Sequence, residues 1–142
     1  MITEDYCSFE IAKFLKEEGF DEYCLGMWHL HNGKKIFEVH YELLNYNELR
    51  DGILLAPTHQ MAMKWLREVH HIVMSISPTC GMLGQFNGYL IIIDKIVDGV
   101  LNNQDEFGLD TLSYEEAVEA ALKYSLENLI KDEKRNTDNE IS

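Results

Sequence analysis

The chain has 142 residues and a formal net charge of −13, because 12 Lys and Arg stand against 25 Asp and Glu. A chain of this length is expected to fold as one domain without a disulfide or a metal. Its Lys and Arg residues are not clustered, which argues against binding to nucleic acid or to an anionic membrane surface. No apolar run approaches the roughly 20 residues of a membrane span. The acidic beginning "MITEDYCSFE" lacks the pattern of a signal peptide, so a cytoplasmic location is expected.

The first predicted element is a helix within residues 3–20, where apolar side chains recur at helical spacing. Thr3 and Ser8 are both suitable N-caps, and Gly19 is a suitable left-handed residue at its end.

Residues 24–44 predict a β-hairpin, because Asn32-Gly33 is a favoured pair for a two-residue turn. That turn sets the register and places Trp28 opposite Phe37. It also places Gly26 opposite Val39 and Cys24 opposite Tyr41. The face expected to point to the core carries Cys24, Trp28, Leu30, Phe37, Val39 and Tyr41. The outer face carries Leu25, Met27, His29, His31, Ile36, Glu38 and His40.

The middle of the chain predicts a polar connector over 45–54, a second helix and a strand. Thr58 is the expected N-cap of the helix. The expected buried stripe of this helix is Met61, Ala62, Trp65, Leu66 and Val69, with Trp65 as the core anchor. The strand at 72–76 is expected to end at Pro78.

Residues 79–88 predict a glycine-rich loop, and residues 89–96 a strand that is apolar on both faces and therefore central. Residues 97–112 are expected to form a loop. The last helix is marked by a capping box, Ser113 with Glu116. Its expected buried side is Tyr114, Ala117, Val118, Ala121, Leu122, Ser125 and Leu129.

The predicted order α-β-β-α-β-β-α favours a two-layer α+β fold, with a mainly antiparallel sheet packed by helices. The expected single domain covers residues 1–130. The charged end, residues 131–142, has almost no apolar side chains and is expected to be disordered.

The segments "LAPTHQMAMKWLREVH" and "SYEEAVEAALKYSLENLI" resemble a group of small uncharacterised proteins of gut Bacteroides species and their phages or prophages. The shared signature is an A-P-T-x-Q-x-A-x-x-W-L-R-E helix, a hairpin and an S-Y-E-E-A helix. The resemblance spans about residues 8–130 and is weak in 42–55 and 78–110. It implies a prophage or mobile-element setting. It brings no known activity and no catalytic residues.

The outer face of the hairpin holds the candidate metal ligands His29, His31, Glu38 and His40, because imidazoles and a carboxylate spaced by two residues on a strand share a face. The expected register staggers these donors along the ribbon and places Lys34 opposite His31. A polar face toward solvent is therefore the preferred interpretation, and no metal is assigned.

Other groups that resemble catalytic sites are interpreted structurally. Glu68 precedes the adjacent His70 and His71, which does not match the helical metalloprotease pattern, and His59 lies more than two turns away. The glycines between Gly81 and Gly88 precede a strand and lack the lysine of a phosphate-binding loop. Cys7, Cys24 and Cys80 form no CxxC and are interpreted as reduced thiols. Cys80 is the single candidate nucleophile, and it would need a histidine partner.

Two hypotheses for function follow from this. The favoured one is a non-catalytic protein-interaction module, because its apolar residues exceed what one helix layer covers. Its partner would be an unknown host protein or, in a homodimer, a second copy. The alternative is a small metal- or ligand-binding domain, or an enzyme, using His29, His31 and His40 with Glu38. No catalytic residue and no cofactor are assigned.

Overall fold

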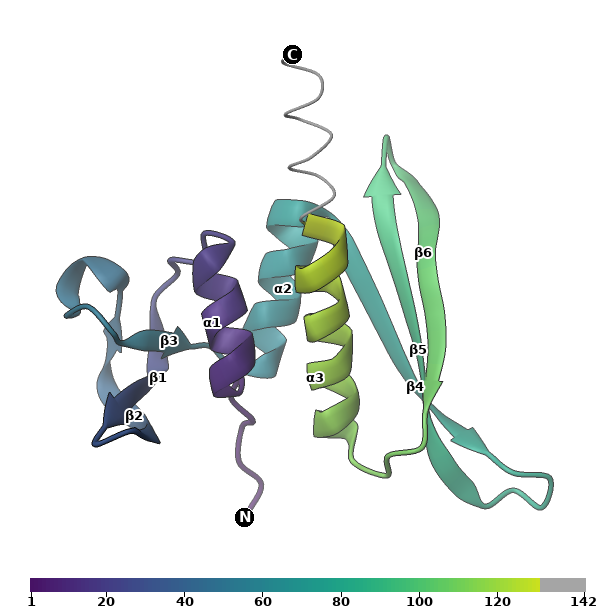
Figure 1. Ribbon diagram of the computed structural model, residues 1–142. Coiled ribbons are helices and arrows are strands. Elements are labelled where there is room, and N and C mark those ends of the chain that lie inside the picture. The colour runs from purple at the N-terminus through teal and green to yellow at the C-terminus, as the bar shows by residue number, and fades with distance from the viewer. Residues whose placement is uncertain (131–142) are drawn as a thin grey trace. The chain divides into compact units, whose positions relative to one another are not determined.

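The computed structural model describes residues 1–130, and in this part of the chain it is an α+β fold with two three-stranded antiparallel sheets (Figure 1). The order is α-β-β-β-α-β-β-β-α, which confirms the predicted class and adds two strands to it. The chain divides into two compact units, Met1–Ala62 and the residues from Met63 onward. Each unit is described by itself. The tail predicted at 131–142 lies outside the described residues, and the single domain stays a prediction.

The first unit contains one helix and the sheet with strand order β2-β1-β3. Its elements are α1 (Phe9–Glu17), β1 (Cys24–His31), β2 (Lys34–Leu44), the 3-10 helix η1 (Tyr46–Glu48) and β3 (Leu54–Ala56). Helix α1 begins at Ser8, whose Oγ accepts a hydrogen bond from the Ile11 N–H at 3.3 Å. It ends before Gly19, which has the left-handed φ of +95° that glycine adopts at least cost.

Helix α1 packs on the sheet of the first unit through Ala12, which contacts Leu54 and Ala56. The aromatic side chains of Phe9, Trp28 and Phe37 surround this cluster. Gly26 allows the close approach of its neighbours, because a Cβ there would lie 2.5 Å from the Ala56 carbonyl oxygen. The core of this unit therefore lies between α1 and one face of β1 and β3.

The hairpin register is confirmed at two of the predicted pairs, Trp28 with Phe37 and Gly26 with Val39. The third pair was wrong, because Cys24 lies opposite Leu44 and not Tyr41. The ladder shifts between these pairs, so β2 carries three residues more than the regular register allows. This bulge-like irregularity interrupts the ladder over residues 40–43, and pairing resumes at Leu44.

The predicted core face of the hairpin was wrong at three of its six residues. Cys24 is buried, and Trp28 and Phe37 are partly buried, whereas the side chains of Leu30, Val39 and Tyr41 are exposed. Helix α1 has nine residues and is therefore only about 13 Å long. A helix of this length cannot cover a ribbon whose second strand has 11 residues.

Helix α2 (His59–His70) contains the boundary between the two units. Thr58 caps it as predicted, since its Oγ1 accepts from the Met61 N–H at 3.2 Å. It ends at His71, whose φ of +58° is left-handed. On the predicted stripe, Ala62, Trp65 and Leu66 are buried, whereas Met61 and Val69 are exposed.

The second unit contains the sheet with strand order β4-β5-β6 and one helix that packs on it (Figure 1). Its elements are β4 (Ile72–Cys80), β5 (Phe86–Val97), β6 (Val100–Leu109), α3 (Tyr114–Tyr124) and the π-helical turn η2 (Ser125–Leu129). Strand β5 is central, as its apolar composition predicted. Ile91 and Ile93 on one face are fully buried, whereas Leu90 and Ile92 on the other are only partly covered.

Two predictions about this sheet were wrong. Strand β4 continues through Pro78 to Cys80, because an edge strand tolerates a residue without a backbone N–H. The predicted loop at 97–112 contains β6, joined to β5 by a tight turn at Asp98 and Gly99, both with positive φ. Strand β6 is a largely exposed edge strand, so it lacks the apolar alternation by which strands are recognised.

Helix α3 begins at the predicted cap, since the Ser113 Oγ accepts from the Glu116 N–H at 3.2 Å. The side facing the sheet is buried over Ala117, Val118, Ala121, Leu122, Ser125 and Leu129. Tyr114 was also expected there, but it is 38% exposed at the first turn. Among the described residues, no helix is long and apolar enough to cross a membrane.

Candidate functional site

A pocket of about 740 Å³ lies in the first unit, between the outer face of the β1–β2 hairpin and the chain that follows it. We call it the histidine pocket. Its lining residues are Met27, His29, Leu30, His31, Glu38, His40, Leu44, Glu48, Leu49, Arg50, Asp51, Gly52 and Ile53. All four predicted metal-ligand candidates line it. The face that was expected to look into solvent is therefore one wall of a hollow, and Met27 on that face is only 6% exposed.

The opposite wall is the segment 44–53, which is held by polar contacts within the first unit. The side chain of Asn45 donates to the Asp21 carbonyl and accepts from the Asn47 N–H at 3.1 Å. The Tyr46 hydroxyl oxygen accepts from the Leu55 N–H at 2.8 Å. These bonds hold the start of the segment and tie it to Leu55, just beyond its end. The charged side chains of the segment line the same pocket as the histidines.

Tyr46 has a structural role in this wall. The pKa of its hydroxyl is raised to about 12, mainly by burial; the hydrogen bond from Leu55 lowers the pKa, and the nearby Cys24 contributes to raising it. A hydroxyl with this pKa stays protonated at neutral pH, so it does not suit general-base chemistry.

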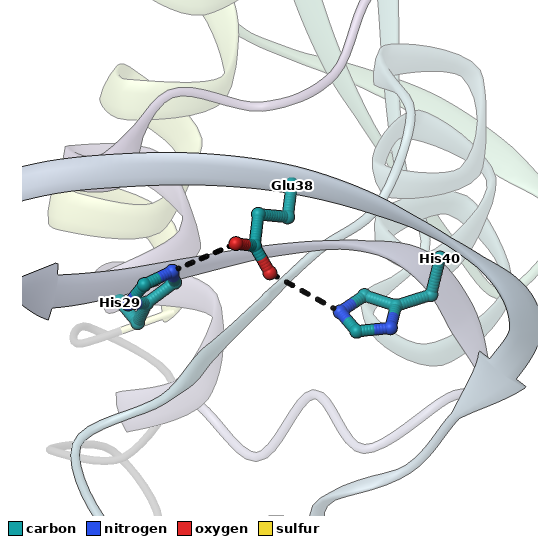
Figure 2. Close-up of polar contacts among 3 residues, drawn as sticks. All are labelled: His29, Glu38 and His40. Atoms are coloured by element: carbon teal, nitrogen blue, oxygen red, sulfur yellow. Dashed lines mark ion pairs between the residues drawn. The ribbon is translucent and has the colours of Figure 1, made fainter.

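Three of the candidate ligands come together on the hairpin face (Figure 2). The Nε2 atom of His29 lies 3.3 Å from Oε1 of Glu38, and the Nε2 atom of His40 lies 3.6 Å from Oε2 of the same carboxylate. Figure 2 shows the carboxylate between the two imidazole rings, with one nitrogen of each turned toward it. His31 lines the same pocket but is exposed. Glu38 thus joins two histidines from neighbouring strands.

The Nε2 atom of His40 is buried without a hydrogen-bond partner, and its one polar contact is the ion pair with Glu38. Buried polar atoms without partners are uncommon in folded proteins and call for an explanation. Lys34 lies opposite His31, as predicted, but it is not among the residues that line the pocket. The charged lining is three carboxylates, Glu38, Glu48 and Asp51, against one guanidinium, that of Arg50.

The histidines of helix α2 have separate structural positions. His59 is buried at the start of the helix, and its backbone N–H donates to the Asp5 carbonyl at 2.9 Å. His71 is the left-handed residue that ends the helix. Glu68 pairs with Lys64 one turn away, at 3.9 Å. This arrangement is that of a capped amphipathic helix, in agreement with the interpretation from the sequence.

The cysteines offer little nucleophilic chemistry. Cys24 is buried, and burial raises the pKa of its thiol to about 12, so the reactive thiolate is suppressed. Cys80 is exposed beside a shallow hollow lined by Pro78, Thr79, Gly84, Phe86 and Tyr89. Within the part of the chain that the structure describes, this lining contains no histidine or carboxylate to act as a base.

The glycine-rich loop before β5 is a turn held by hydrogen bonds between its own backbone groups. The Gly81 N–H donates to the Gln85 carbonyl at 2.8 Å, and the Gly84 N–H donates to the Gly81 carbonyl at 3.0 Å. Since these backbone donors are used within the turn, they are not arranged to cradle a phosphate.

Sequence reasoning missed the contribution of Glu48, Arg50 and Asp51. The connector predicted at 45–54 contains Gly52, whose positive φ of +89° is typical of a turn. However, a turn signal does not tell which face of a distant hairpin the returning chain will cover.

Comparison with known proteins gives no match: no family model, no curated protein and no solved structure is similar to this chain at a significant level.

Proposed function

We propose that this protein is a non-catalytic interaction module that binds another chain by strand addition at β2. The proposal is supported by the segment from His40 to Leu43, which is extended but has no partner in the β1 ladder. The exposed fractions of Val39, Tyr41 and Leu43 are 52, 104 and 57%. We call these three residues the β2 stripe. An edge strand with exposed apolar side chains is the kind of surface that β-augmentation uses.

The β2 strand lies at the end of its sheet, next to β1 alone in the described part of the chain. Its outer edge therefore has room for a further strand. Backbone hydrogen bonds would supply much of the affinity, and the alternating side chains would supply the specificity.

We propose a second copy of the chain as the partner, on grounds of charge. Strand β2 begins with Lys34 and Lys35 and carries Glu38 and Glu42 further on. When two copies pair antiparallel, the basic start of one strand faces the acidic part of the other. The two lysines and two glutamates of β2 give the strand a net charge of zero, whereas the whole chain has a net charge of −13. Electrostatic repulsion between two copies is therefore weak at this edge.

We also propose that the module works in the cytoplasm of a bacterial host, within the prophage setting that the resemblance implies. Cys24 and Cys80 form no disulfide within the described residues, and this supports a reducing compartment. An unknown host protein is the alternative partner for the same strand.

Light scattering across a concentration series tests the homodimer. We expect the mass to rise from monomer toward dimer as the protein concentration rises. Tyr41→Arg should shift the equilibrium to monomer by placing a charge in the stripe. Glu42→Pro should do the same because proline removes a backbone N–H from the edge.

The matched control is Leu83→Arg at the turn between β4 and β5. Leu83 is 94% exposed, close to the exposure of Tyr41, and its replacement should leave the mass measured by light scattering unchanged. A monomer at every concentration would overturn the second copy as the partner. A host protein that binds the parent but neither β2 variant would reassign the strand to a different chain. Dimers unaffected by either β2 variant would show that the copies meet elsewhere.

A further inference from the structure

We infer that the histidine pocket binds one divalent transition-metal ion through His29, Glu38 and His40. This inference is independent of self-association, because it rests on the pocket and not on the outer edge of β2. It reverses the interpretation that the sequence favoured for these residues.

The donor atoms have the right chemistry, and each imidazole nitrogen lies close to the shared carboxylate. Two imidazole nitrogens with one carboxylate suit zinc and similar borderline ions. Ligands that share one zinc ion at about 2 Å lie roughly 3–3.5 Å from each other. The Nε2 of His29 is 3.3 Å from Oε1 of Glu38, and the Nε2 of His40 is 3.6 Å from Oε2.

The two imidazoles approach opposite oxygens of Glu38, so one ion is shared by all three only after side-chain rotation (Figure 2). The side chains of His29, Glu38 and His40 are 27, 49 and 39% exposed, and they border an open pocket. Partly exposed side chains change rotamer more readily than packed core groups. The backbone already brings the donors together, since His29 and Glu38 lie on adjacent strands of one ladder.

The buried Nε2 of His40 is the second observation that points to a ligand. Glu38 at 3.6 Å is beyond ordinary hydrogen-bond distance, so this nitrogen keeps a lone pair or a proton without a full partner. A bound ion would satisfy the lone pair of a neutral imidazole directly. Without a metal ion, the contact with Glu38 alone leaves this lone pair unsatisfied.

The charge of the pocket also favours a cation. With neutral histidines, Glu38, Glu48 and Asp51 outweigh Arg50 by two negative charges. A divalent ion would neutralise this excess. Three protein ligands leave at least one coordination position open toward the cavity, where water or a small ligand can bind.

The test is calorimetric titration of the full chain with Zn²⁺, after treatment with a chelator and in a Cys80→Ser background that removes the exposed thiol. We expect one ion per chain. The variants His29→Gln, Glu38→Gln and His40→Gln should each weaken binding by roughly tenfold or more. The control His71→Asn changes an exposed histidine outside the pocket to a residue that tolerates positive φ, and it should bind like the parent.

A lack of saturable binding, or equal affinity in the parent and all three ligand variants, overturns the inference. Circular dichroism of each variant checks folding. The visible spectrum of the parent loaded with Co²⁺ gives a result that needs no variant: imidazole and carboxylate ligation is expected, and a thiolate charge-transfer band would place the ion elsewhere. Tyr41→Arg should retain metal affinity even where it abolishes the dimer, so the two proposals fail separately.

Discussion

The indole N–H of Trp28 donates to the backbone carbonyl of Cys7 at 2.9 Å, across 21 positions of the chain. This bond ties β1 to the segment that precedes α1. We predict that Trp28→Phe lowers the free energy of unfolding by about 1–3 kcal/mol, because the carbonyl loses its donor while the ring volume is largely kept. Urea unfolding measures this. Tyr41→Phe, at a fully exposed site, should stay within about 0.5 kcal/mol of the parent. Equal stability of Trp28→Phe and parent would mean that the bond does not form.

Trp65 is the predicted core anchor of helix α2, and its side chain is 7% exposed. Trp65→Ala should destabilise the protein by about 3–5 kcal/mol, as the loss of a large buried side chain does. Val69→Ala on the same helix provides the comparison, since Val69 is exposed. Similar unfolding midpoints for the two variants would contradict the assignment of Trp65 to the core.

Ser113 caps α3 through the hydrogen bond that its Oγ accepts from the Glu116 N–H. Ser113→Ala should cost about 1 kcal/mol, measured by thermal or urea unfolding. Ser113→Asp should retain most of the stability, because its carboxylate can accept the same bond and suits the positive end of the helix dipole. If Asp is as destabilising as Ala, the hydroxyl acts in some way other than capping.

Cysteine reactivity should follow exposure and pKa. In the folded protein at about pH 8, an alkylating reagent should modify Cys80 quickly and spare Cys24, whose raised pKa suppresses the thiolate. Mass spectrometry of peptides after brief labelling measures both sites. Labelling in denaturant, where both thiols should react, is the control. Rapid modification of Cys24 without denaturant would contradict its burial.

Stability should decline in alkaline solution because of Cys24 and Tyr46. Their folded-state pKa values are raised from 9.0 and 10.0 to about 12, so unfolding releases protons above pH 9. Their contribution is fully present below about pH 9 and is lost as the pH rises toward about 12. Urea midpoints across this range test the prediction. A Cys24→Ala variant should show a shallower decline, and an identical decline would exclude Cys24 as a cause.

The donor residues of the hairpin face were predictable, but the second wall of the pocket and the geometry of the site were not. Alternation along β1 and β2 places His29, His31, Glu38 and His40 on one face, and this requires only local geometry. The second wall of the pocket is made by a segment that follows the hairpin, and no local pattern indicated that it folds back over this face.

The sequence by itself determined the local features of this protein. Thr58 and Ser113 begin their helices where expected, and Ser8 is one of the two N-caps expected for the first helix. Asn32-Gly33 turns the hairpin with Trp28 opposite Phe37. Each of these depends on backbone conformation and hydrogen bonds within a few residues, so residue type is sufficient to predict it.

Only the tertiary structure decided where Cys24 pairs, that the polar residues of β6 form a strand, and that Glu38 joins two histidines in a pocket. The bulge in β2 moves Tyr41 out of the expected core face. The edge strand β6 is held by its ladder with β5 and not by burial of its own side chains. These outcomes depend on contacts between segments far apart in the sequence. Such contacts decide which side chains are buried, and they therefore override the local secondary-structure preference of each segment.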